Sequence, residues 1–330
     1  MRNFKKLLVR GILILAFLFC FEQGVRFVYE PVGNNSIYTV KDLKTREGTL
    51  ETLVLGTSLA HWGIDTNVLE QTIDSPSFNL ATSAQPLDAS YYLLKDQAKR
   101  NPLKRVFLGV HVTSLINENQ GIQIKEGVFD RILSPVGKAE YLLRTAGWKE
   151  FEQYLFYAAR VDNVLTKDKA IENIKYKMSE EFKNGIPPEG QRLFYLGSGN
   201  ENKRQVYDGK FAKKKLGRDA TWKRSKVIEA AEDSLEKIGK FCEQKGIELN
   251  LVVMPMTWEF TKLMGDLDDF HAYLQEFCDE NGANLYDFHT YEGVYDGLFT
   301  NEDYQDKKHF NVEGAKKCAR ILGEWYLSAQ

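Results

Sequence analysis

Short apolar runs recur along this chain, and each is followed by a small or polar residue. The third run, Arg105-Val106-Phe107-Leu108-Gly109-Val110, is apolar almost without a break, as in a strand that is buried on both faces. Runs of this kind cover five segments, namely 52–56, 77–81, 105–110, 248–254 and 284–288. We expect each to form a β-strand, because each is short and bounded by turn-forming residues.

Apolar residues at helical spacing lie between these runs. They predict helices over the segments 66–72, 86–100, 224–245, 259–280 and 311–327. Strands that alternate with helices are typical of an α/β fold, because parallel strands need crossover connections. We therefore predict a three-layer α/β/α domain with a mostly parallel five-stranded sheet.

The N-terminal stretch has a different pattern. Four cations, Arg2, Lys5, Lys6 and Arg10, precede the uninterrupted apolar run 11–21. The run is short for a membrane span of about 20 residues, but it lengthens if residues 7–9 are included and Arg10 snorkels to the interface. No small-x-small cleavage site follows. We therefore expect residues 1–29 to form an uncleaved signal anchor, a single transmembrane helix with a cytoplasmic N-terminus and the remainder extracellular.

The pattern after the anchor divides into three parts. Residues 30–48 are polar and predict a stalk, and residues 49–330 form the α/β domain. Within that domain, residues 113–222 break the alternation with an aromatic-rich helical stretch and a basic run over 210–226. We interpret them as an inserted cap over the strand ends. The basic run is either a solvated face or a contact for an anionic polymer or lipid headgroups.

Composition and motifs argue against several classes of function. A formal net charge of -2 gives no general reason to expect nucleic acid. The 4 cysteines show no paired spacing for a zinc site or a disulfide framework, and Cys242, Cys278 and Cys318 lie on predicted helices as buried thiols. No GxGxxG or Walker sequence follows a predicted strand, and no HxxxH pair occurs. Neither a cofactor nor a metal is expected.

Two stretches carry candidate chemistry. Ser58 comes two residues after the first predicted strand, where an open α/β sheet places its ligands, and its hydroxyl is a nucleophile if a base reaches it. His309 lies between the fifth strand and the last helix, with Asp306 three residues earlier and Asn311 suited to cap that helix. Because both stretches belong at the same sheet edge, we expect a Ser58-His309-Asp306 triad. The alternatives are a serine that only caps the next helix and an ordinary surface loop.

These blocks resemble those of the SGNH (GDSL-like) hydrolase superfamily. Gly56-Thr57-Ser58 stands at its nucleophile block, and Asp306-Lys307-Lys308-His309 at its terminal aspartate-x-x-histidine block. The second block resembles residues 79–84, with Ala84 at the usual glycine position. His111 stands where the third block has an asparagine. The resemblance implies a flavodoxin-like SGNH fold, serine-dependent acyl-ester chemistry, and an oxyanion hole formed by Ser58, Ala84 and His111.

A narrower resemblance is to membrane-anchored members, the D-alanyl transfer protein of teichoic acid synthesis and the alginate-type O-acetylation proteins. It implies transfer of an acetyl or D-alanyl group onto a cell-surface polysaccharide or teichoic-type polymer. The implied partner is a membrane-embedded acyl donor protein of the O-acyltransferase type. Two alternatives stay open: a secreted carbohydrate esterase, and a catalytically silent binding or assembly subunit.

Overall fold

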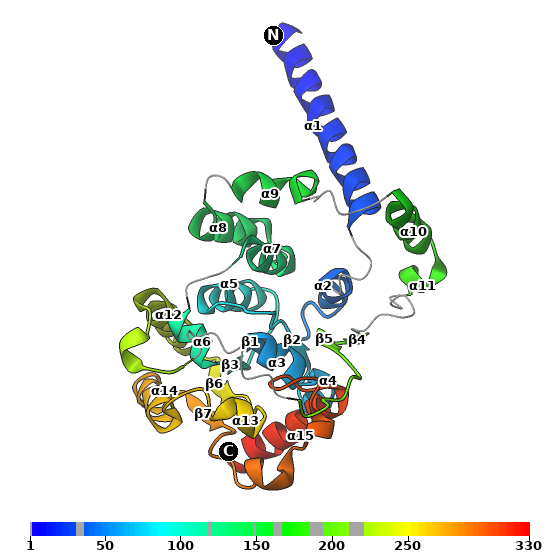
Figure 1. The fold of residues 1–330 in the computed structure, drawn as a ribbon. Coiled ribbons are helices and arrows are strands. Elements are labelled where there is room, and N and C mark those ends of the chain that lie inside the picture. The colour runs from blue at the N-terminus through cyan, green and yellow to red at the C-terminus, as the bar shows by residue number, and fades with distance from the viewer. Residues whose placement is uncertain are drawn as a thin grey trace. The chain divides into compact units, whose positions relative to one another are not determined.

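The computed structural model describes residues 2–30, 36–117, 121–147, 150–160, 167–184, 194–210 and 221–330. They divide into two units (Figure 1). The larger unit consists of Tyr38–Tyr141 and Arg192–Gln330, and the smaller unit of Met1–Ile37 and Leu142–Gln191.

A five-stranded sheet organises the larger unit, and all of its strand pairs are parallel. Its strands are β1 (Thr52–Gly56), β2 (Ser77–Asn79), β3 (Arg105–Gly109), β6 (Glu248–Val253) and β7 (Asn284–Asp287). The predicted α/β fold and mostly parallel sheet are therefore confirmed. The spatial order β2-β1-β3-β6-β7 reverses direction between β1 and β3, and open α/β sheets bind ligands at such a switch point.

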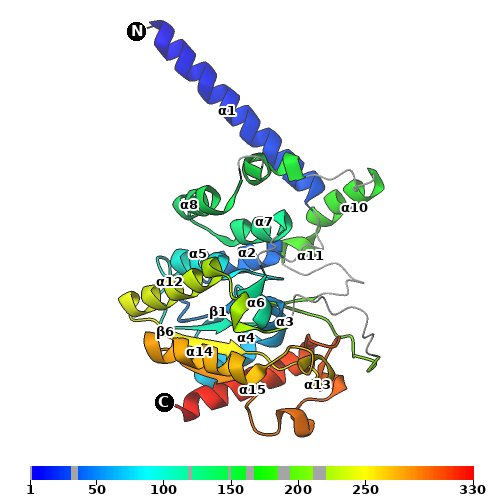
Figure 2. The same ribbon diagram turned by 60° about the vertical axis from the view of Figure 1, so that its left-hand side comes forward.

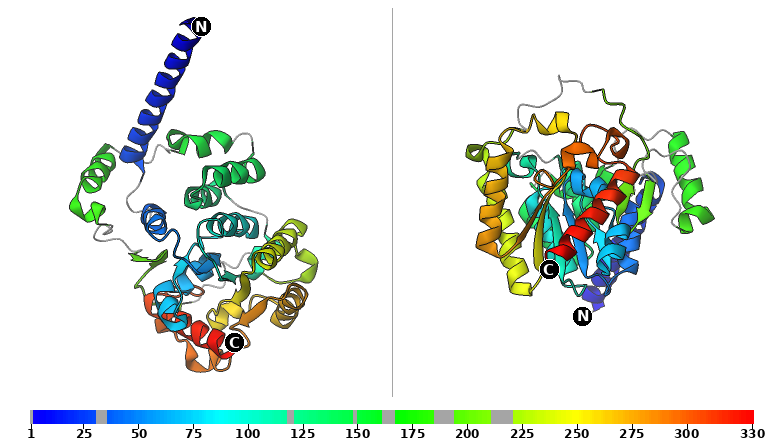
Figure 3. Two further views of the ribbon diagram at one scale, coloured as in Figure 1. Left: turned by 180° about the vertical axis from the view of Figure 1, so that it is seen from behind. Right: turned by 90° about the horizontal axis from the view of Figure 1, so that it is seen from below.

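Helices cover both faces of this sheet. They include α3 (Ser58–Gly63), α4 (Thr66–Ile73), α5 (Leu87–Gln97), α12 (Glu229–Lys245), α14 (Leu267–Asn281) and α15 (Val312–Ser328). In Figure 2, α5 and α12 lie above the strands and α15 lies below them, and α15 packs against α4. Figure 3 shows α15, in red, crossing the sheet when the molecule is seen from below.

The last helix illustrates how the sequence pattern produces this packing. Asn311 caps α15, accepting hydrogen bonds from the backbone N–H groups of Glu313 and Gly314 at 3.0 and 3.1 Å. The apolar stripe of the helix is buried as predicted and comprises Val312, Ala315, Cys318, Ala319, Leu322 and Tyr326. Cys242, Cys278 and Cys318 are buried free thiols, also as predicted.

The N-terminal segment forms one long helix, α1 (Arg2–Tyr29). Among the residues that the structure describes, no helix combines the length and the apolar character that crossing a membrane requires. The transmembrane helix predicted over 1–29 is therefore not supported, although its helical conformation is confirmed. The physical reason is that Arg10 and Glu22 enclose the uncharged run 11–21, which is far shorter than the approximately 20 residues that a span needs.

The smaller unit holds the end of α1 by hydrogen bonds from α10 (Lys167–Lys177). The Lys177 ammonium donates to the carbonyl oxygens of Arg26, Phe27 and Glu30 at 3.0, 3.0 and 2.6 Å. These contacts satisfy carbonyl groups that the end of a helix leaves unpaired. The unit also contains α9 (Phe151–Leu155) and α11 (Glu180–Lys183).

Two predicted segments differ from the structure. Part of the expected stalk 30–48 is a helix, α2 (Ser36–Thr45), because Tyr38 and Leu43 are buried within the larger unit. Residues 31–35 lie outside the described residues. The helix predicted over 259–280 is divided into α13 (Trp258–Thr261) and α14, since Asp266 caps a new helix by accepting from the Asp269 N–H.

The residues predicted as one insertion, 113–222, are divided between the two units. Their elements in or bordering the larger unit include α6 (Val112–Ile116), α7 (Ile122–Arg131), α8 (Pro135–Thr145) and the antiparallel hairpin β4 (Phe194–Gly197) with β5 (Asn200–Asn202). The hairpin contacts α3. Most of the basic run 210–226 lies outside the described residues.

Candidate active site

Ser58 lies where β1 ends and α3 begins. Gly56 turns the chain there with a φ of +128°, and a Cβ on it would lie 2.4 Å from the Gly109 carbonyl oxygen on β3. A side chain at position 56 is therefore excluded. Thr57 is the N-cap of α3, with its hydroxyl oxygen 3.4 Å from the Leu59 backbone nitrogen. The alternative in which Ser58 caps the helix is therefore wrong, and its hydroxyl is left for another partner.

Asn79, at the end of β2, holds α3 in place through hydrogen bonds. Its buried side-chain amide donates to the carbonyl oxygens of Ala60 and Ile64 at 3.2 and 3.0 Å. Its carbonyl oxygen accepts a hydrogen bond from the Ala81 N–H at 3.0 Å. One side chain thus connects the helix that begins with Ser58 to the segment that continues towards Ala84.

The structure brings together the three residues predicted as a triad. Ser58 Oγ lies 2.9 Å from His309 Nε2, and His309 Nδ1 lies 2.9 Å from Asp306 Oδ2. An ionised carboxylate only accepts hydrogen bonds, so Nδ1 carries the ring proton and Nε2 faces the serine with a lone pair. This arrangement has the geometry of a nucleophile, a general base and an orienting acid.

Backbone contacts hold the loop that carries His309. Asp306 Oδ1 accepts the N–H groups of Lys308 and His309 at 2.9 and 3.0 Å. The Thr257 hydroxyl, beyond the end of β6, donates to the Lys307 carbonyl at 2.6 Å. The imidazole is therefore oriented by its own loop and by the adjacent strand end.

The electrostatic surroundings favour a neutral His309 and an ionised Asp306. Burial lowers the pKa of His309 below its ordinary value; Asp306 opposes this shift, and Lys308 and Lys203 add to it. Burial alone would raise the pKa of Asp306, but the hydrogen bond and charge of His309, together with the two backbone donors, lower that pKa to about 2. A neutral imidazole beside a serine is suited to accept its proton.

His111 has a buried ring N–H group for which the described residues provide no acceptor. Its Nδ1 accepts the Thr113 backbone N–H at 3.2 Å, so the proton of the neutral ring is on Nε2. Burial, with Lys308, His289 and His309, lowers the pKa of His111 to about 3, which keeps the ring neutral. Nε2 is buried without a hydrogen-bond partner in the described part of the chain. The register that pairs Gly56 with Gly109 places this donor one strand away from the serine.

Ala84 has a left-handed backbone, with a φ of +51°. This conformation favours glycine, which is the residue that the resembling family has there. The Ala84 N–H makes no hydrogen bond with the other described residues and is available to a ligand. The structure therefore provides free N–H donors at two of the predicted oxyanion positions, Ala84 and His111.

No protein-family model and no curated protein sequence matches this chain. Among solved structures, the fold is similar to a crystal structure described as a "putative acylhydrolase" from Bacteroides fragilis. The TM-score is 0.38, with 9% sequence identity over 90% of this chain and 97% of that chain. This similarity is too low to carry a functional argument, so the assignment rests on the geometry of the site.

Sequence reasoning missed two neighbours of the triad. The Trp62 ring packs edge-on against the His309 ring with 4.6 Å between centroids, and Lys203 Nζ lies 5.3 Å from the Trp62 ring centroid. Lys203 follows β5, so no local spacing relates it to His309. His61, three residues after Ser58, is buried with its Nε2 3.5 Å from Glu201 Oε2.

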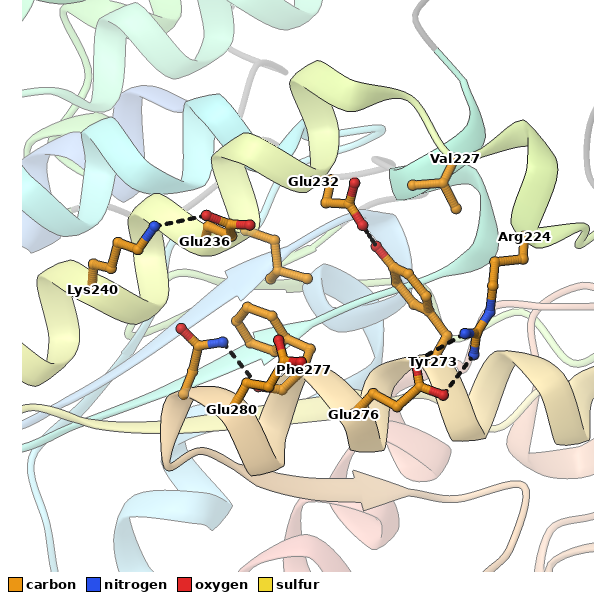
Figure 4. Close-up of a pocket in the computed structure, with 11 residues that line it drawn as sticks. Arg224, Val227, Glu232, Glu236, Lys240, Tyr273, Glu276, Phe277 and Glu280 are labelled. Carbon is orange, nitrogen blue, oxygen red and sulfur yellow. Dashed lines mark hydrogen bonds and ion pairs between the residues drawn. The ribbon is translucent and has the colours of Figure 1, made fainter.

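A groove of about 640 Å³ lies elsewhere, between α12 and α14 (Figure 4). Its charges are largely paired: Arg224 binds Glu276 through two hydrogen bonds of 2.9 and 3.0 Å, and the Tyr273 hydroxyl donates to Glu232 at 2.9 Å. None of the triad residues lines it. The described residues also contain no cluster of three or more His, Cys, Asp or Glu side chains arranged to hold a metal ion.

Proposed function

We propose that this protein is a serine-dependent acyl-transfer enzyme that esterifies a cell-surface polysaccharide or teichoic-type polymer with an acetyl or D-alanyl group. The observation that carries the proposal is the hydrogen-bonded chain from Ser58 through His309 to Asp306 at the switch point of the sheet. Ala84 and His111 follow the two strands that pair with β1, and their free N–H groups would stabilise the oxyanion that ester chemistry develops.

The first half of the reaction forms an acyl-enzyme. Ser58 Oγ bonds to the acyl carbon while its proton passes to His309 Nε2, and Asp306 stabilises the resulting imidazolium. The oxyanion accepts hydrogen bonds from the N–H groups of Ser58, Ala84 and His111. The ester bond then breaks, and the leaving oxygen or sulfur takes the proton back from His309.

The second half regenerates the enzyme. A hydroxyl of the acceptor gives its proton to His309 Nε2 and attacks the acyl carbon. The tetrahedral intermediate collapses, Ser58 Oγ leaves, and it recovers the proton from His309. Water in place of the acceptor completes hydrolysis instead, so an acyltransferase and an esterase share every residue named here.

The same proposal attaches the protein to the cell membrane through α1, with the larger unit outside the cell and a membrane-embedded acyl donor protein as its partner. Large apolar side chains of α1 are exposed, among them Leu13 at 63% and Phe17 at 68%. A tether raises the local concentration of a membrane partner to the order of millimolar. Burying such side chains in lipid would contribute about 1.5–3 kcal/mol each.

Kinetics with an activated acetyl ester test the chemical core of the proposal. Ser58→Ala and His309→Ala are expected to abolish turnover, and Asp306→Asn is expected to retain a small part of the wild-type rate. Ser328→Ala, an exposed serine on α15, is the matched control and should behave as wild type. Products analysed with and without a glycan acceptor separate transfer from hydrolysis. Wild-type rates in the Ser58 or His309 variant would contradict the triad, and release of free acid alone would favour the esterase.

A further inference from the structure

Two lysines lie close to His309, and neither pairs with an acidic side chain in the described part of the chain. Lys308 immediately precedes His309 in the loop 304–310, which we call the catalytic loop, and Lys203 follows the hairpin strand β5. Both side chains are partly buried, and neither forms an ion pair with any residue that the structure describes. A partly buried ammonium group loses hydration, which is unfavourable unless another group replaces it.

Backbone hydrogen bonds determine the position of Lys203. Its carbonyl accepts the Val312 N–H at 3.0 Å, and the Tyr207 N–H donates to the Tyr304 carbonyl at 2.8 Å. The segment 203–207 therefore runs along the catalytic loop. The Lys203 ammonium lies over the same Trp62 ring that packs against His309.

The charge of Lys308 affects both histidines of the site. It lowers the pKa of His309 and also the pKa of His111, although burial is the larger cause for each. The nearest carboxylate, on Asp306, already accepts the His309 ring N–H and two backbone N–H groups. The positive charge of Lys308 therefore acts on both the base and the oxyanion donor.

We propose that Lys203 and Lys308 form a subsite for an anionic group, a carboxylate or a phosphate, that the substrate carries close to its scissile ester. The inference rests on the proposed function, because it names the class of ester that this site prefers. A carboxylate would belong to the acyl group and a phosphate to the alcohol. Either one would replace the water that the two ammonium groups lose on burial.

Pairs of matched ester substrates, assayed with the full-length protein, test this subsite. For the acyl side, the mono-4-nitrophenyl ester of glutaric acid is compared with 4-nitrophenyl valerate. For the alcohol side, 1-acetylglycerol 3-phosphate is compared with 1-acetylglycerol. Measurements at pH 8 and low ionic strength keep His309 neutral in every variant, which removes any effect of the lysines on its protonation, and leave the ion pairs unscreened.

In the wild type, we expect kcat/KM for at least one anionic ester to exceed that of its neutral match by about 10-fold, through a lower KM. The double variant Lys203→Gln/Lys308→Gln should abolish the preference, because its loss of kcat/KM should fall mainly on the anionic esters. Lys240→Gln, an exposed lysine on α12, should retain the preference. The ester pair that shows the preference tells whether the anionic group belongs to the acyl group or to the alcohol.

Three results would overturn the inference: no anionic preference in the wild type, a preference that survives the double variant, or an equal loss for neutral and anionic esters. Turnover of the neutral esters without a preference would refute the subsite and leave the proposed function intact. Absence of turnover with every ester would refute the proposed function, and the subsite with it.

Discussion

At the scale of single residues, the chemistry of the site depends on which nitrogen atoms carry protons. His309 presents a lone pair to Ser58 because Asp306 holds its Nδ1–H, whereas His111 presents an N–H because Thr113 occupies its Nδ1. Two histidines at one sheet edge are thus held in opposite tautomers. One is suited to accept a proton and the other to stabilise an oxyanion.

Substitution at His111 tests the second of these roles. His111→Asn keeps an N–H donor and is a good N-cap for α6, so it should retain substantial activity. His111→Ala removes both, and it should lower kcat about 10²–10³-fold and destabilise the fold by about 1 kcal/mol. Ester hydrolysis rates and unfolding by urea provide the two readouts. Similar, near wild-type rates in both variants would show that His111 is structural only.

The acid limb of the pH profile reports on His309. The protonated ring cannot act as base, so kcat/KM should rise as pH increases through its pKa, and burial places that midpoint below the ordinary value of about 6.5. Lys308→Gln removes a positive charge and should move the midpoint upwards. Rate profiles with a neutral ester measure both. A wild-type midpoint above pH 7, or a downward shift in the variant, would contradict this electrostatic account.

At the scale of elements, α3 depends on one buried side chain from the neighbouring strand. Asn79→Ala leaves the Ile64 carbonyl and the Ala81 N–H without their partner, and each unsatisfied buried group costs about 1–3 kcal/mol. We expect the free energy of unfolding to fall by about 2–4 kcal/mol, with a loss of activity because α3 carries Ser58. Asn281→Ala on α14 is the control, since Asn281 donates to the single Phe277 carbonyl in a more exposed position. Equal effects on denaturant midpoints would refute this role of Asn79.

The sequence pattern predicts those features of single helices, strands and loops that consecutive residues determine. β3 and α15 could be located because their apolar periods are local, and the Asp306-to-His309 spacing lies within one loop. Lys203 and Asn79 could not be assigned, because each acts on residues that are distant in the chain. The helix α2 was missed since Tyr38 and Leu43 are too few to define a period.

At the scale of the whole molecule, strand order explains why distant segments meet at one site. Ser58 follows β1 and His111 follows β3, on the two sides of the switch point, and the catalytic loop precedes α15. Alternation of elements predicts a parallel sheet, but it does not determine which strands are neighbours. The rule that parallel strands end at one sheet edge predicted that Ser58 and His309 meet, and the family resemblance added Ala84 and His111.

The proposed membrane attachment is also a property of the whole chain. The full-length protein should float with phospholipid vesicles, because α1 exposes large apolar side chains around its whole circumference between Ile12 and Phe21. Leu13→Asp/Phe17→Asp should abolish flotation, whereas Leu143→Asp, at a leucine that is 70% exposed in α8, should not. Flotation of the double variant, or failure of the wild type to float, would exclude attachment through α1. Protease digestion of intact cells then tests the extracellular position of the larger unit.

The central claim is that Ser58 forms a covalent acyl intermediate, and the intact mass of the protein tests it most directly. After brief incubation with 4-nitrophenyl acetate and an acid quench, the wild-type protein should gain the mass of one acetyl group, and peptide mapping should locate it on Ser58. The Ser58→Ala variant should gain none. An unmodified wild type, or the same adduct in the Ser58→Ala variant, would contradict the account.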